Sequence, residues 1–114
     1  MLFKKYSSLL KKYLNEIGYK MKYVNGDSLY YIEGYTSDYS GNKLFIINEK
    51  SHFVGYVEEI TENFWTFIEE YDYESLNHLY NLANQYLIKA KEQNIKNKLK
   101  ELENDFQWYV WFYS

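Results

Sequence analysis

The 114-residue sequence contains no cysteine, no proline and no arginine, and it has only five glycines and two histidines. Without cysteine the chain has no disulfides, thiolate nucleophiles or cysteine-ligated zinc sites, and His52 and His78 are its only imidazoles. Arginine is the side chain best suited to bidentate recognition of phosphates and bases, so its absence argues against a sequence-reading nucleic-acid binder. The scattered glycines form no phosphate-binding loop, nucleophile elbow or dinucleotide fingerprint.

Long apolar runs are also missing. No stretch reaches the roughly 18 uncharged apolar residues of a membrane span, and lysines interrupt the N-terminal region where a signal peptide would have its apolar core. We therefore expect a cytoplasmic protein that does not contact a membrane. The content of 46% hydrophobic and 22% aromatic residues is far above that of disordered chains, so residues 1–114 are expected to fold as one domain.

The net charge of −3 conceals a strong segregation of charge along the chain. Residues 1–25 carry six lysines and one glutamate, whereas residues 51–88 carry seven carboxylates and no lysine. Lysine, asparagine, tyrosine, isoleucine and phenylalanine make up nearly half of the chain, and their codons are rich in A and T. This bias indicates a gene from a low-GC bacterium, or from a phage or mobile element that lives in one.

The N-terminal half predicts a helix followed by a sheet. Apolar residues recur at helical spacing between Leu2 and Ile17, and Gly18 is placed to end the helix. Alternation then begins at Tyr19, and Asn25-Gly26 is a strong hairpin signal. Further strands are expected near residues 28–35, 44–47 and 53–57, which gives a four-stranded antiparallel meander with the helix on one face.

Residues 58–73 are expected to form an irregular connection that contains at most a short strand. From Glu74 the helical period returns and continues to Phe106, with Asp72 or Ser75 available as the N-cap. A helix of this length would outrun a four-stranded sheet, so we expect either a break near residues 93–94 or a projecting half. The chain ends in an aromatic segment at residues 106–113. The predicted class is α+β, with the following core: Leu9, Leu10, Leu14, Ile17, Met21, Tyr23, Ile32, Phe45, Ile47, Val54, Tyr56, Leu79 and Ala83.

Catalytic and metal-binding interpretations have little support. Glu74 and His78 share a helix face at a spacing that suits a metal ion, but no third ligand is in register. The pairs Glu58-Glu59 and Glu69-Glu70 would suit acid–base hydrolysis of glycosides, but adjacent side chains point apart. We therefore expect no enzymatic activity, no catalytic residues, no metal and no cofactor.

Two surface features favour a protein-binding module. Carboxylates interleaved with aromatic side chains resemble the phosphates and stacked bases of a nucleic acid, and would suit the basic channel of another protein. The alternative is a solvated acidic face that aids solubility. The aromatic C-terminal segment is either a partner or oligomer interface or a last element folded onto the sheet. The expected partner-binding residues are Glu58, Glu59, Glu62, Trp65, Glu69, Glu70, Asp72, Tyr73 and Glu74, and the second interface would use Trp108, Trp111 and Tyr113.

Residues 64–72, FWTFIEEYD, and residues 79–86, LYNLANQY, resemble a recurring ending of small accessory proteins from phages of low-GC Gram-positive bacteria. The size, the acidity and the order of elements are similar to those of anti-CRISPR inhibitors of type II effector nucleases. This resemblance implies a non-enzymatic inhibitor that binds a CRISPR effector nuclease in the host cytoplasm as a DNA mimic, without binding nucleic acid itself.

Three alternatives remain open. A toxin-neutralising immunity protein would also be small, acidic and non-catalytic. A homo-oligomeric structural or interaction protein, for example a homodimer, would pair through residues 95–113. A single-strand nucleic-acid binder would use the lysine-rich face of the first helix, although the missing arginines argue against it.

Overall fold

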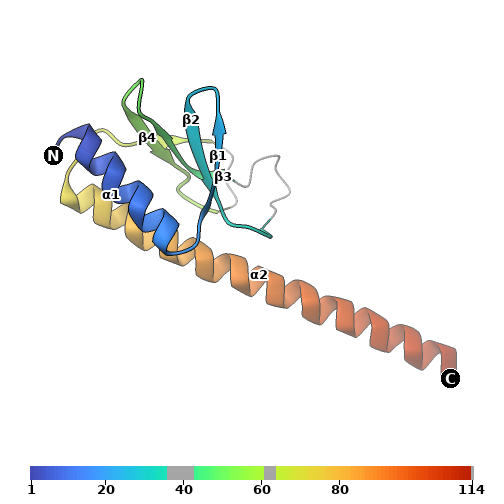
Figure 1. The fold of residues 1–114 in the computed structure, drawn as a ribbon. Helices are drawn as coiled ribbons and strands as arrows, with labels where there is room; N and C mark the ends of the chain where they lie inside the picture. Colours follow the sequence, from blue (N-terminus) through green and yellow to red (C-terminus); the bar gives the residue numbers. More distant parts are fainter. Residues whose placement is uncertain (36–42, 61–63, 114) are drawn as a thin grey trace.

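The computed structural model confirms the α+β class (Figure 1). Its elements follow the order α1 (Phe3–Glu16), β1 (Lys20–Val24), β2 (Asp27–Tyr31), β3 (Lys43–Asn48), β4 (Phe53–Tyr56), β5 (Thr66–Phe67) and α2 (Tyr73–Tyr113). The structure describes residues 1–35, 43–60 and 64–113, and within α2 it describes the side chains as far as residue 96 and at Leu99. All five strands pair antiparallel with their sequence neighbours, so the sheet is the expected meander with β5 added at one edge.

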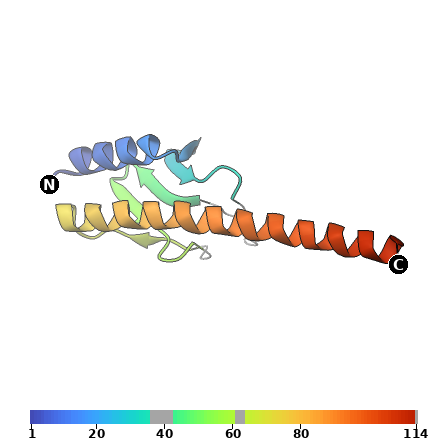
Figure 2. The same cartoon turned by 90° about the horizontal axis from the view of Figure 1, so that it is seen from below.

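The two helices lie side by side on one face of the sheet and run in the same direction (Figures 1 and 2). Three contacts show this direction, because the residue numbers rise together on both helices. The hydroxyl groups of Tyr6 and Ser75 are 3.0 Å apart, the Tyr80 hydroxyl donates to the Leu9 carbonyl at 3.4 Å, and the Asn84 amide donates to the Tyr13 hydroxyl. The helices therefore cover the sheet as one layer.

Local turn signals in the sequence are used as predicted. Gly18 has φ of +103° and follows α1, and the amides of Gly18 and Tyr19 donate to the carbonyls of Asn15 and Leu14, which is a Schellman ending. Asn25 and Gly26 both have positive φ, as a type I′ hairpin turn between β1 and β2 requires. The turn at Gly18 sets the direction in which the chain continues after α1. The turn at Asn25-Gly26 sets the register between β1 and β2.

The core lies between the sheet and the two helices, and tyrosine side chains form an unusual share of it. Tyr6, Tyr19 and Tyr86 are buried together with Leu10, Leu14, Phe45, Ile47, Val54, Leu79 and Ala83. Each of the three tyrosine hydroxyls has a partner: the Tyr19 hydroxyl donates to the Ala83 carbonyl at 2.8 Å, and the Tyr86 hydroxyl donates to the Val57 carbonyl. Among the described residues no buried side-chain polar atom lacks a hydrogen-bond partner.

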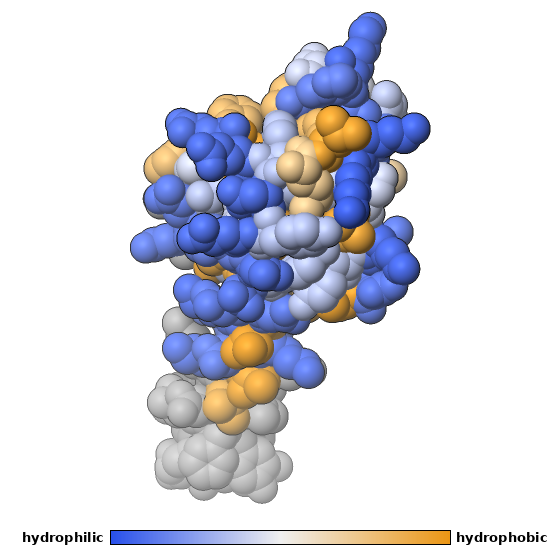
Figure 3. Space-filling model, turned by 90° about the vertical axis from the view of Figure 1, so that its left-hand side faces the viewer, coloured by the Kyte–Doolittle hydropathy of each residue, from blue (hydrophilic) through white to orange (hydrophobic). Residues whose placement is uncertain are grey.

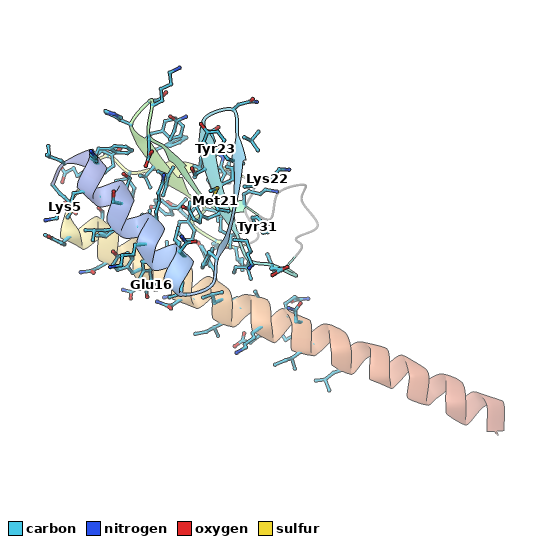
Figure 4. The ribbon with its side chains drawn as sticks, viewed as in Figure 1. Lys5, Glu16, Met21, Lys22, Tyr23 and Tyr31 are labelled. Carbon is cyan, nitrogen blue, oxygen red and sulfur yellow. The ribbon has the colours of Figure 1, made fainter. Side chains whose placement is uncertain are left out.

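Two predicted core residues are exposed instead. Met21 is 48% exposed and Tyr23 is 68% exposed, because β1 is an edge strand that lies beside α1 and not beneath it (Figure 4). Leu9, Ile17 and Tyr56 pack against the core but are only partly buried. The alternating pattern therefore identified β1 correctly but could not show that the helices leave it uncovered.

The prediction of an irregular connection with a possible short strand over residues 58–73 is confirmed, because Thr66 and Phe67 pair with β4 as the two-residue strand β5. The second predicted strand is shorter than expected and ends at Tyr31.

Helix α2 is continuous over 41 residues, with no break near residues 93–94. Its first half packs on the body, and Ala90 is the last buried side chain among those that the structure describes on α2. The remainder, residues 91–113, projects from the body for about 34 Å and makes the molecule 67 Å long (Figure 2). We call this projecting part the arm. The predicted aromatic segment at residues 106–113 is thus helical in its backbone, while its side chains lie outside the described part of the chain.

Candidate functional site

Five of the predicted acidic residues lie exposed along the β4–β5 side of the body. Glu58 and Glu59 follow β4, Glu69 and Glu70 follow β5, and Glu74 lies in the first turn of α2. We call these five residues the acidic edge. Carboxylates from three successive segments of the chain therefore lie along this side of the body.

Hydrogen bonds to the backbone hold each of these segments in place. The Tyr86 hydroxyl donates to the Val57 carbonyl, immediately before Glu58. The Ile68 amide donates to the Val54 carbonyl at 2.9 Å, immediately before Glu69. The Ser75 hydroxyl donates to the Glu70 carbonyl at 2.9 Å. The carboxylates are thus carried on fixed backbone, which lowers the entropy that a partner must remove on binding.

The acidic edge consists of two clusters. Tyr86 places Glu58 and Glu59 beside the fourth turn of α2, whereas Glu74 lies in its first turn. The helix rises about 18 Å between these two points. Glu69 and Glu70 belong with Glu74, because the Ser75 hydroxyl bonds to Glu70. A partner would therefore meet negative charge at both ends of one edge.

Several lysines of the body lie on α1 and on β1, and Lys5 of α1 lies close to Tyr73 at the start of α2. The described ion pairs join Lys11 to Glu49 at 2.6 Å, Lys12 to Glu16 at 4.0 Å and Lys20 to Glu33 at 3.9 Å. In contrast, Glu59, Glu69, Glu70 and Glu74 form no ion pair with any residue that the structure describes. Their charge is available to a partner.

Asp72 has a structural role that the sequence already suggested. Its carboxylate accepts a hydrogen bond from the Ser75 amide at 2.8 Å, so Asp72 is the N-cap of α2. Tyr73, the next residue, is exposed, and the Lys5 ammonium lies 5.8 Å from its ring centre. Asp72 therefore orients the start of the helix that carries Glu74.

The remaining predicted residues are distributed differently. Trp65 is half-buried and packs against the core. Glu62 lies outside the described residues, and so do the side chains of Trp108, Trp111 and Tyr113 on the arm. The structure thus brings Glu69, Glu70 and Glu74 together with Tyr73, and it leaves the second predicted interface untested.

Phe64 and Phe67 are exposed aromatic residues that the predicted partner-binding set did not include. Phe67 lies on the outer face of the sheet, away from the helices, where its ring meets Phe53 edge-on at a centroid distance of 5.5 Å. The Phe67 ring crosses over Gly55. A Cβ atom at position 55 would lie 3.2 Å from this ring and 2.8 Å from Cγ2 of Ile46. The glycine inside the strand at Gly55 was the available signal, because such a glycine often marks a close approach.

The histidines take part in aromatic packing. His52 stacks on Phe3 with ring centroids 4.8 Å apart, and His78 meets the edge of Tyr56 at 5.9 Å. No group of three or more metal-ligating side chains lies together in the described ranges 1–35, 43–60 and 64–96. The described helices include none that is long and apolar enough to cross a membrane.

In comparisons with protein-family models, with curated proteins and with solved structures, nothing matches this chain.

Proposed function

We propose that this chain is a non-enzymatic inhibitor that binds a CRISPR effector nuclease of a bacterial host through the acidic edge. By occupying the basic channel of the nuclease, it would block nucleic-acid access inside the host cytoplasm, without a cofactor and without contacting nucleic acid itself. The observation that carries this proposal is the set of exposed glutamates at Glu59, Glu69, Glu70 and Glu74, which form no ion pair with any residue that the structure describes.

The electrostatics support a basic partner. A protein channel that binds nucleic acid presents lysines and arginines at the positions of phosphates, and carboxylates held on fixed backbone compete for the same positions. Complementary charge of this kind accelerates association and selects the partner. The expected interaction weakens as the salt concentration rises.

Exposed aromatic rings beside the acidic edge supply the apolar part of an interface. Phe64, Phe67 and Tyr73 are each more than half exposed, and they come from the same segment as the glutamates. Aromatic residues are enriched among those that dominate binding energy, and carboxylates alone rarely give a tight complex. The proposed surface combines both kinds of group.

The test is inhibition of target cleavage by purified type II effector nucleases of low-GC Gram-positive bacteria, each loaded with guide RNA. The chain is titrated against each nuclease, and cleavage of a matching duplex is measured. We expect stoichiometric inhibition of at least one nuclease. The quadruple variant Glu58→Lys, Glu59→Lys, Glu69→Lys, Glu70→Lys should inhibit at least about tenfold more weakly, which corresponds to about 1.4 kcal/mol.

The control is Glu16→Lys with Glu33→Lys, since both residues are exposed glutamates outside the acidic edge. This control should inhibit as well as the native chain. Its matched counterpart is Glu69→Lys with Glu70→Lys, which changes the net charge by the same amount and should weaken inhibition. The proposal is wrong if no nuclease in the panel is inhibited, or if the control loses as much inhibition as its matched counterpart.

A further inference from the structure

The arm is a long helix without a partner in the described structure. Beyond Ala90 every described side chain on α2 is exposed, and Ile88, Ile95 and Leu99 are each more than half exposed. A single helix of this length is only marginally stable in water unless an apolar face is buried. Figure 3 shows hydrophobic side chains gathered at the base of the arm, below the hydrophilic body.

The apolar positions of the arm follow the heptad repeat of a coiled coil. From Ile88 the stripe continues at steps of alternately four and three residues, with Glu92 as its one polar member. The members of this stripe are Ile88, Glu92, Ile95, Leu99, Leu102, Phe106, Tyr109 and Tyr113. This stripe is distinct from the face that packs on the body, because that face runs through Leu79, Ala83, Tyr86 and Ala90 and is two residues out of phase with Ile88.

The charges that flank the stripe indicate the orientation of a partner helix. In heptad register the flanking positions are basic at Lys96 and Lys98 and acidic at Glu103 and Asp105. Two arms can pair antiparallel about a centre between residues 100 and 101. Lys96 of each copy then lies opposite Glu103 of the other, and Lys98 lies opposite Asp105. Parallel pairing would also form one attractive pair, Lys98 with Glu103, but it would set Lys91 opposite Lys96 and Glu92 against its own copy.

The length of the arm fits the same antiparallel register. Leu99 of one copy meets Leu102 of the other, Ile95 meets Phe106, and Ile88 meets Tyr113. The end of each arm then reaches the point where the other arm leaves its body.

A hollow lies at that point. It has a volume of about 360 Å³. Its lining combines apolar side chains with polar ones: Ile17, Ile32, Leu87, Ile88 and Ala90, with Glu33, Lys91 and Asn94. The antiparallel register sets position 112 of the second copy opposite Lys91, on the side of α2 that faces this hollow. Phe112 of the second copy would thus lie against a partly apolar hollow on the body of the first copy. A parallel pair would not bring it there.

We propose that two copies of this chain pair through residues 88–113 as an antiparallel coiled coil, with the aromatic end of each arm seated against the body of the other copy. This inference does not rest on the acidic edge. The resulting dimer would carry its two acidic edges on bodies at opposite ends of the paired arms.

The oligomeric state is the first test. Sedimentation equilibrium of the full chain at micromolar concentration should give a dimer. The variant Leu99→Asp with Leu102→Asp should raise the dissociation constant at least about tenfold. The control Asn97→Asp lies in the arm but off the stripe, and it should remain dimeric. Circular dichroism of the tyrosine-rich core shows whether each variant keeps its folded body.

Orientation is tested with cysteines, since the native chain has none. The double variant Ile95→Cys, Phe106→Cys should form a disulfide-linked dimer, while each single variant should not. Within one helix these positions are about 16 Å apart, too far for an internal disulfide. A monomer at every concentration, a dimer that withstands the Leu99 and Leu102 substitutions, or self-cross-linking of the single cysteine variants would each overturn the proposal. Inhibition of a nuclease is measured in a separate experiment. If the chain does not dimerise, the proposal about the acidic edge is therefore unaffected.

Discussion

Three tyrosine hydroxyls lie inside the body, and the fold gives each of them a partner. Tyr6 pairs with Ser75, Tyr19 with the Ala83 carbonyl and Tyr86 with the Val57 carbonyl. Each bond joins α2 to a different segment of the chain. A phenylalanine in these places would nearly fill the space but would remove one hydrogen bond from the Ala83 carbonyl, the Val57 carbonyl or the Ser75 hydroxyl, which is costly in a buried site.

Removing the Tyr19 hydroxyl should lower the free energy of unfolding. Tyr19→Phe leaves the buried Ala83 carbonyl without its side-chain donor, and we expect a loss of about 1 kcal/mol. Tyr23→Phe is the control, because Tyr23 is exposed and should change stability little. Urea denaturation followed by circular dichroism measures both, and equal effects of the two substitutions would contradict the assigned role.

The same tyrosines predict alkaline destabilisation. Burial raises the pKa of Tyr6 to about 12, although its hydrogen bond with Ser75 opposes this, and burial also raises the pKa of Tyr19. The unfolded chain releases these protons near the ordinary tyrosine pKa of about 10, so stability is intact below that pH. It should fall as pH rises from about 10 towards the folded pKa, by about 1.4 kcal/mol per pH unit for each such tyrosine.

Urea denaturation at a series of pH values measures this slope. Tyr6→Phe removes one titrating group and should make the decline shallower than in the native chain. A free energy of unfolding that stays constant up to about pH 12 would contradict the burial of these hydroxyls.

At the scale of the elements, short-range chemistry explains which parts of the fold could be predicted. Gly18 and Asn25-Gly26 act through their own backbone conformations, so the end of α1 and the first hairpin were legible in the sequence. The exposure of Met21 and Tyr23 could not be predicted, because it depends on where α1 and α2 pack, and that packing involves contacts between distant segments.

Strand β5 and the acidic edge show the same limit. Thr66 and Phe67 are too few to produce a periodic signal, and their pairing depends on the close approach at Gly55. The sequence placed seven carboxylates in one block, but only the paths of β4, β5 and α2 divide the exposed ones into two clusters. Asp72 was predicted both as a partner-binding residue and as a cap, and the hydrogen bond to Ser75 supports the second role.

Loss of the cap at Asp72 should destabilise α2. Asp72→Ala removes the acceptor of the Ser75 amide, and we expect a loss of about 1 kcal/mol in the free energy of unfolding. Glu74→Gln is the control, since Glu74 lies in the same first turn and its side chain has no described partner. Thermal and urea denaturation should separate the two variants, and an equal loss would contradict the capping role.

At the scale of the whole molecule, charge and shape are both polarised. The lysines of residues 1–25 lie on α1 and β1, whereas the acidic edge follows β4, β5 and the start of α2, and the arm carries the helix far beyond the body (Figure 1). A solvated acidic face needs no fixed geometry, whereas hydrogen bonds hold the segments of this edge in place. This difference supports an interface and argues against charge that serves only solubility.

The central claim is that the acidic edge and nucleic acid compete for one channel. The most direct measurement titrates the chain into a guide-loaded nuclease that it inhibits, with and without bound target duplex, and follows binding of both. We predict mutual exclusion, with binding of the chain that weakens as salt rises. A stable complex that holds nuclease, duplex and chain together would contradict the claim.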